Sequence, residues 1–169
     1  MNYAKAGVFF FVLWLIQTTL LWRVWPFGAA PHLLLCATVC FAYLFNSNFA
    51  FVYAIVFGLL LDLQVQYLFG VSALLLVLCC IPAWLLSYSF NPERALPCVI
   101  AALIATLINV FGLWGIYSLF GAPASIFVSI RMLPELLISQ AALCLVLHIV
   151  FVRIIIRDRR DRRYMGGIV

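Results

Sequence analysis

Six stretches of almost uninterrupted apolar residues divide this chain, and they restrict its fold more than any other feature. The fifth, from Cys98 to Phe120, contains no charged side chain. About 20 such residues suffice for an α-helix to cross the hydrocarbon core of a bilayer. Over the whole chain, 68% of residues are hydrophobic and 9% are charged, whereas soluble domains carry about 25% charged residues. These values exclude a soluble domain and predict an all-α, polytopic membrane protein.

The expected membrane segments are separated by short breaks that are polar or contain proline. By residue number they cover 6–22, 32–45, 49–63, 71–89, 98–120 and 134–156. The second and third are short for a span, so they could instead merge into a hairpin or a re-entrant element. We therefore predict one domain, residues 1–156, built as a compact bundle of six transmembrane helices, with five as the alternative. Residues 157–169 form a basic tail.

The positions of the basic residues predict the orientation of this bundle. With six spans and a cytoplasmic N-terminus, eight Lys or Arg residues lie on the inner side and two, Arg23 and Arg131, on the outer side. The inner set includes the tail residues Arg157, Arg159, Arg160, Arg162 and Arg163. This asymmetry follows the positive-inside rule and places both termini in the cytoplasm. The tail is also suited to anionic lipid, and its place beside a span argues against a role in binding nucleic acid.

An acid, Asp62, lies near the end of the third segment among apolar neighbours. Ala50, Ala54 and Gly58 precede it at intervals of four residues, so the four share one helical face. Small residues allow close helix packing in a membrane, and we expect this face to be turned toward protein. An acid at a helix C-terminus opposes the helix dipole. A partner is therefore expected, with Arg131 as the best cation; a hydrated acid without a partner is the alternative.

Other polar residues near the spans have structural interpretations. Glu135 follows Pro134 where the sixth segment is expected to begin, so it should cap that helix, or else pair with Arg131 four residues earlier. Asn109 shares a face with small residues of the fifth segment, which predicts a hydrogen bond to a neighbouring helix.

No residue pattern in the chain indicates catalysis or a cofactor. The sequence has no H-E-x-x-H, no G-x-S-x-G and no phosphate-binding loop, so we predict a protein that is not an enzyme. The cysteines lie almost entirely in apolar runs and form no C-x-x-C pair, which favours packing by small hydrophobic side chains over metal binding. They are Cys36, Cys40, Cys79, Cys80, Cys98 and Cys144.

Two stretches, "APHLLLCATVCFAYLF" and "FGLLLDLQVQYLFGVSALLLVLCC", resemble the bacterial rod shape-determining protein MreD family. In that family a proline precedes an apolar helix. A glycine and leucines then lead to an aspartate, and a second glycine follows about eight residues later. The matching positions here are Pro31, Gly58, Leu60, Leu61, Asp62 and Gly70. His32 departs from the pattern, since the family commonly has Asp or Asn there.

The resemblance implies a non-enzymatic subunit of the cell-elongation complex in the bacterial cytoplasmic membrane, where it helps to organise peptidoglycan synthesis for cell shape. Its implied partner is the bitopic protein MreC, with RodA, the elongation-specific penicillin-binding transpeptidase and MreB as indirect partners. The family is also similar in architecture to the substrate-binding membrane subunits of energy-coupling-factor vitamin transporters. That similarity supplies the alternative function, binding of a small molecule for transport.

Overall fold

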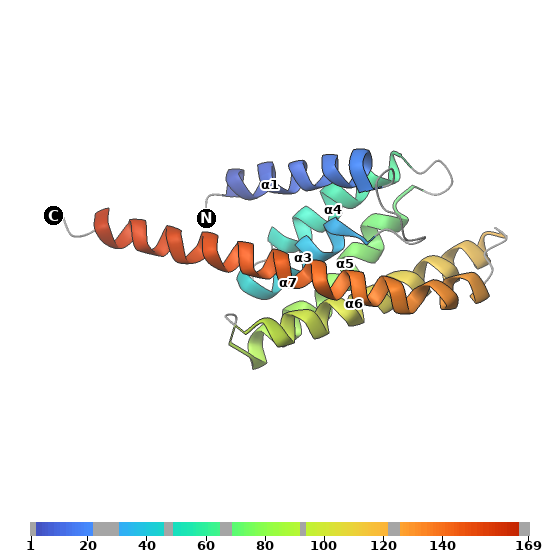
Figure 1. The fold of residues 1–169 in the computed structure, drawn as a ribbon. Coiled ribbons are helices and arrows are strands. Elements are labelled where there is room, and N and C mark those ends of the chain that lie inside the picture. The colour runs from blue at the N-terminus through green and yellow to red at the C-terminus, as the bar shows by residue number, and fades with distance from the viewer. Residues whose placement is uncertain are drawn as a thin grey trace.

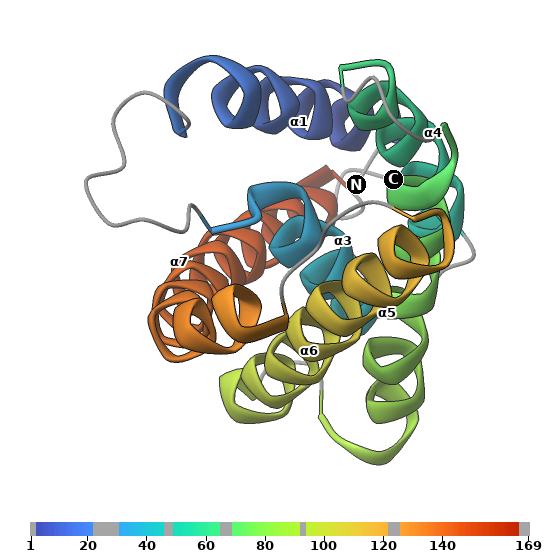
Figure 2. The same ribbon diagram turned by 90° about the vertical axis from the view of Figure 1, so that its right-hand side faces the viewer.

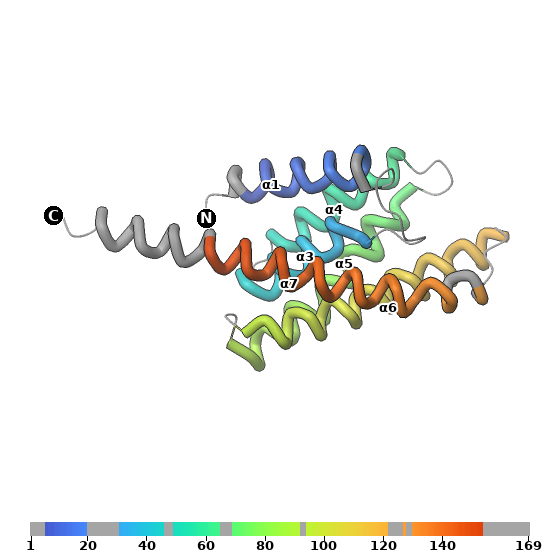
Figure 3. The backbone as a smooth tube through the Cα atoms, viewed as in Figure 1, coloured from blue at the N-terminus to red at the C-terminus, as the bar shows by residue number. Residues whose placement is uncertain are grey.

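The computed structural model of the chain is a bundle of helices (Figure 1). Its backbone is described for residues 3–21, 31–45, 49–64, 69–91, 94–121 and 126–165. Side chains are described for 6–19, 31–45, 49–64, 69–91, 94–121, 127 and 130–153. Figure 3 draws the other positions in grey.

All regular structure in the described residues is helical, as predicted. A short π-helical turn, η1, continues the first helix. In chain order the elements are α1 (Tyr3–Ile16), η1 (Gln17–Leu21), α3 (Leu33–Phe45), α4 (Phe49–Asp62), α5 (Val71–Ser89), α6 (Ala95–Leu119) and α7 (Ile126–Met165).

Three helices of the described chain are long and apolar enough to cross a membrane: α5, α6 and the part of α7 from Ile130 to Arg153. The remaining apolar helices are shorter; α3, for example, has 13 residues. At 1.5 Å per residue it extends over about 20 Å, against a hydrocarbon core of about 30 Å. The length and composition of the helices therefore support a membrane protein, while the count of six spans stays a prediction.

The last helix differs from its expected bounds. It begins at Ile126 and continues to Met165, so Pro134 lies inside it, and the prediction that Pro134 opens this helix is wrong. An interior proline removes one backbone N–H, a loss that membrane helices tolerate when neighbouring groups compensate. The helix also passes residue 156 without a break, so the basic tail continues α7 up to Met165.

The short helix α3 lies in the middle of the bundle. Every residue from Leu33 to Tyr43 is buried, and α1, α4, α5, α6 and α7 all pack against it. Figure 2 shows α3 between these helices. A helix that is apolar on every face is stable where every face is covered. Because its start is also enclosed by protein, the backbone groups there need partners from other helices.

Candidate functional site

The carboxylate of Asp62 caps the N-terminus of the next helix, α5. Its Oδ2 accepts hydrogen bonds from the backbone N–H groups of Gly70 at 2.9 Å and Ala73 at 3.4 Å, and its Oδ1 accepts one from Ser72 at 3.0 Å. The first amides of a helix lack partners within the helix, and they attract negative charge. An anion from the end of α4 thus stabilises the start of α5, and the side chain is 4% exposed.

Arg131 is therefore not the partner of Asp62, and the expectation of that pair is wrong. The two charges need not meet, because three backbone amides already compensate the carboxylate. Arg131 is exposed on α7 and forms no ion pair with any residue that the structure describes.

One turn before Asp62, Gly58 brings the backbones of α4 and α5 into contact. A Cβ atom at Gly58 would lie 2.3 Å from the Cα and 2.8 Å from the backbone nitrogen of Ala73. No side chain fits at that distance, so glycine is required for this approach. Ala73 is also the third amide that Asp62 caps. The close contact and the cap therefore act on the same turn of α5.

Gly70 completes this arrangement, which we call the α4–α5 clamp (Gly58, Asp62, Gly70, Ser72 and Ala73). It is the residue before α5, and its backbone φ of 96° lies in the left-handed region. Residues with a Cβ atom adopt this conformation at a cost of roughly 1–2 kcal/mol. The turn directs the Gly70 N–H at the carboxylate of Asp62.

The small residues of the stripe that ends at Asp62 lie inside the chain. Ala50 and Ala54 are fully buried, and Gly58 is covered by α5. This face is therefore occupied by packing between helices of the same molecule. Asn109, the polar residue of the corresponding stripe on α6, is half-buried. Its side chain forms no hydrogen bond with another described residue, unlike the prediction.

Glu135 lies inside α7 rather than in its first turn, so its predicted role as a helix cap is wrong. Its Oε1 atom is shielded from solvent and has no hydrogen-bond partner among the described residues. It also forms no ion pair with Arg131 one turn earlier. The arginines 157, 159, 160, 162 and 163 belong to α7, and their side chains lie outside the described set.

Two glutamines that were not predicted as site residues hold the start of α3. Gln140 of α7 accepts a hydrogen bond from the backbone N–H of His32 at 2.9 Å and donates one to its carbonyl oxygen at 3.2 Å. Gln17 accepts a bond from the N–H of Leu34 at 3.0 Å. These contacts satisfy backbone N–H groups at the start of α3 that lack partners within the helix. The sequence signal that could have indicated them is that Gln17 and Gln140 are each a polar residue within an apolar stretch.

The far end of α3 is attached as well. The hydroxyl of Tyr43 donates a hydrogen bond to the backbone carbonyl oxygen of Asn91, 2.9 Å away, in the connection between α5 and α6. The central helix is therefore held at both ends by polar contacts and along its length by apolar packing.

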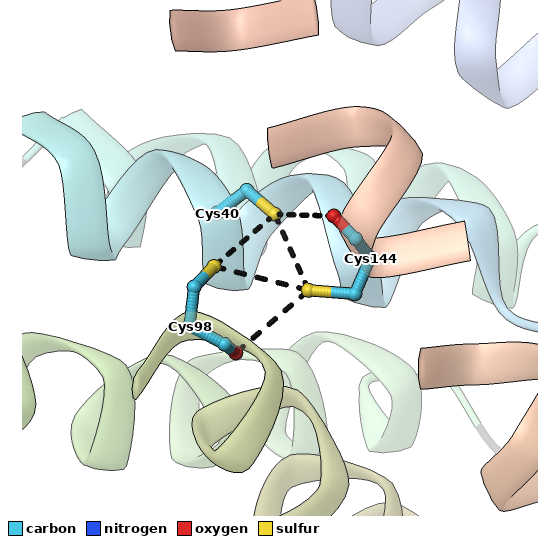
Figure 4. Close-up of side chains that lie close together, drawn as sticks. All are labelled: Cys40, Cys98 and Cys144. Atoms are coloured by element: carbon cyan, nitrogen blue, oxygen red, sulfur yellow. Dashed lines mark hydrogen bonds between the residues drawn. The ribbon is translucent and has the colours of Figure 1, made fainter. Parts of the chain in front are cut away.

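All six cysteines are buried and carry free thiols. The structure brings three of them together, although the sequence separates them widely: Cys40 of α3, Cys98 of α6 and Cys144 of α7 (Figure 4). Sequence spacing could not indicate this cluster, because each residue belongs to a different helix.

Comparison of the sequence with protein-family models identifies the family of this chain. A family model described as rod shape-determining protein MreD matches residues 3–156 of the chain. The chain belongs to the MreD family. The family match extends from α1 into α7 and includes the whole α4–α5 clamp. Comparisons with curated proteins and with solved structures give no match.

Membership in the MreD family makes this chain a membrane protein of the rod-shape system, and that family is not a known enzyme family. Within this MreD chain, the aspartate and the two glycines that carried the sequence resemblance fall together at the α4–α5 clamp. Asp62 caps a helix, and Gly58 allows close contact between two backbones, so both roles are structural.

Proposed function

We propose that this MreD-family chain is a non-enzymatic subunit of the bacterial cell-elongation complex that binds an MreC-like bitopic membrane protein. The observation that carries the proposal is the use made of Asp62: its carboxylate is engaged by three backbone amides of the same chain. Asp62, the acid most suggestive of transport or catalysis, therefore has a structural role as the cap of α5. Through its partner the chain would help to organise peptidoglycan synthesis, with RodA, the elongation-specific transpeptidase and MreB as indirect partners.

The partner contact is best assigned to the outward face of α7. The small-residue stripe of α4 is already covered by other helices, so a partner cannot use it. Arg131, by contrast, is exposed on α7 without an ion pair in the described chain. Long basic side chains near the end of a membrane segment extend to the aqueous interface, where an acidic group of the partner would pair with Arg131.

Co-purification of the chain with its MreC-like protein from detergent-solubilised membranes tests this proposal. We expect the wild-type chain to retain the partner and the Arg131→Ala variant to lose most of it. Arg153→Ala is the matched control, because Arg153 is also exposed on α7, about six turns further along. Failure of the wild type to retain the partner refutes the proposed function. Equal retention by both variants refutes the assignment of Arg131.

We also propose that the chain lies in the cytoplasmic membrane with both termini in the cytoplasm. The excess of basic residues on one side supports this orientation. In Figure 1, α7 runs back toward the end of the bundle at which α1 begins, which suits two termini on one side. Reporter fusions to each terminus measure the orientation directly, and an external C-terminus contradicts it.

The alternative function, binding of a small molecule for transport, requires several polar groups that converge on an open site. Asp62 would be the natural anion of such a site, but its hydrogen bonds within the chain leave it 4% exposed. We therefore retain the scaffold role as the proposal.

A further inference from the structure

Three thiols converge in the centre of the bundle. The sulfur of Cys40 lies 3.5 Å from that of Cys98 and 3.6 Å from that of Cys144, and the remaining pair is 3.8 Å apart. None of the three residues is exposed to solvent. Figure 4 shows the side chains pointing toward one another from three different helices.

The size of this triangle suits a metal ion. A point equidistant from the three sulfur atoms lies about 2.1 Å from each, close to the typical metal–thiolate distance of about 2.3 Å for zinc. A displacement of the ion by about 1 Å out of the sulfur plane reaches that distance. No movement of the helices is needed.

We propose that Cys40, Cys98 and Cys144 form a binding site for a single Cu(I) ion. Thiolate ligands select soft ions, chiefly Cu(I) and zinc. Zinc completes a tetrahedron, with a fourth protein ligand or with water. The three sulfurs form a trigonal set, which Cu(I) accepts, and no fourth His, Cys, Asp or Glu among the described residues joins the same group of mutually close ligand atoms.

Binding of the ion releases protons from the thiols to solvent, because the thiolate rather than the thiol is the metal ligand. The same thiols without metal have each other and two carbonyl oxygens, those of Cys98 and Cys144, as weak hydrogen-bond partners.

The surrounding structure holds the three ligands in place. Cys40 belongs to the central helix α3, which is attached at one end through Gln140 and at the other through Tyr43. Cys98 lies in the first turn of α6, four residues after the exposed Arg94. The cluster is therefore about 6 Å along the helix from the connection between α5 and α6.

Anaerobic loading of the purified full-length protein tests the site. The protein, reduced and stripped of metal in detergent, is mixed with Cu(I) in the presence of a chromophoric Cu(I) chelator. We expect about one copper per chain. In Cys144→Ser and in Cys98→Ala, copper affinity should fall by at least about tenfold. Cys79→Ser is the control, because Cys79 is equally buried but contacts Ala105 instead of the cluster, and it should bind copper as the wild type does.

Two further measurements keep the proposal testable if a cluster variant does not fold. X-ray absorption of the copper-loaded wild type should show three sulfur neighbours at about 2.2–2.3 Å. Cu(I) should raise the Tm of the wild type and of Cys79→Ser. Absence of copper binding in the wild type, or copper bound without sulfur, overturns the site. Equal loss of binding in the control and the cluster variants also overturns it. Preferential binding of zinc overturns the choice of ion.

Discussion

Replacement of Asp62 by leucine removes the acceptor of three backbone amides at the start of α5 while keeping the number and branching of the side-chain heavy atoms. A buried amide that loses its acceptor costs about 1–3 kcal/mol. Two of the three bonds are short, at 2.9 and 3.0 Å, and the third is 3.4 Å. We therefore expect a loss of about 3–5 kcal/mol in the free energy of unfolding, out of a typical total of about 5–15 kcal/mol.

Asp62→Asn separates the contribution of charge from that of hydrogen bonding. The amide retains one acceptor oxygen but lacks the negative charge that favours a helix N-terminus, a contribution of up to about 2 kcal/mol in partly buried sites. The asparagine variant should therefore lose about 1–2 kcal/mol, clearly less than the leucine variant. This order follows from the cap alone and does not involve Arg131.

Unfolding in mixed micelles, followed by circular dichroism as the fraction of denaturing detergent rises, measures both changes. Gln64→Ala is the control, because Gln64 is exposed two residues beyond Asp62, and it should stay within about 0.5 kcal/mol of the wild type. Arg131→Ala should do the same. A leucine variant as stable as the control would falsify the assignment of Asp62 as the cap of α5, and destabilisation by Arg131→Ala equal to that of Asp62→Asn would revive the ion pair.

The same unfolding assay checks three further changes. Gly58→Ala should cost about 1–3 kcal/mol because its Cβ meets the backbone of Ala73, whereas Gly115→Ala, in open space on α6, should be neutral or stabilising by up to about 1 kcal/mol; similar values for both contradict the close contact. Gly70→Ala should cost about 1–2 kcal/mol for its left-handed backbone, and wild-type stability rules out that conformation. Gln140→Leu should lower the free energy of unfolding by about 1–3 kcal/mol because it leaves the His32 N–H unpaired. Wild-type stability of this variant contradicts the hydrogen bond between Gln140 and the start of α3.

The helical segments were largely predictable from hydropathy. The bounds of α5 agree with those expected, and α3 and α4 agree to within one residue. The error concerned α7, where a proline in an apolar stretch was interpreted as a helix start. A proline inside a helix and a proline at its first position look alike in sequence, since the difference depends on whether surrounding groups compensate for the missing N–H.

The candidate site was predictable in part. Four-residue spacing placed Ala50, Ala54, Gly58 and Asp62 on one face, and burial of that face follows from the close packing of small residues. The partner of Asp62 was not predictable by a search for a cation, because backbone amides carry no signature in the side-chain sequence. Only the turn at Gly70 brings them to the carboxylate.

By itself, the sequence determined that this chain is a helical membrane protein with a small-residue face ending in an acid, because hydropathy and helical periodicity are local properties. The tertiary structure decided which helix became the enclosed centre, which amides the acid caps and which cysteines meet. Those outcomes depend on contacts between residues far apart in the chain, such as Cys40 and Cys144, and such contacts exist only once the helices have packed.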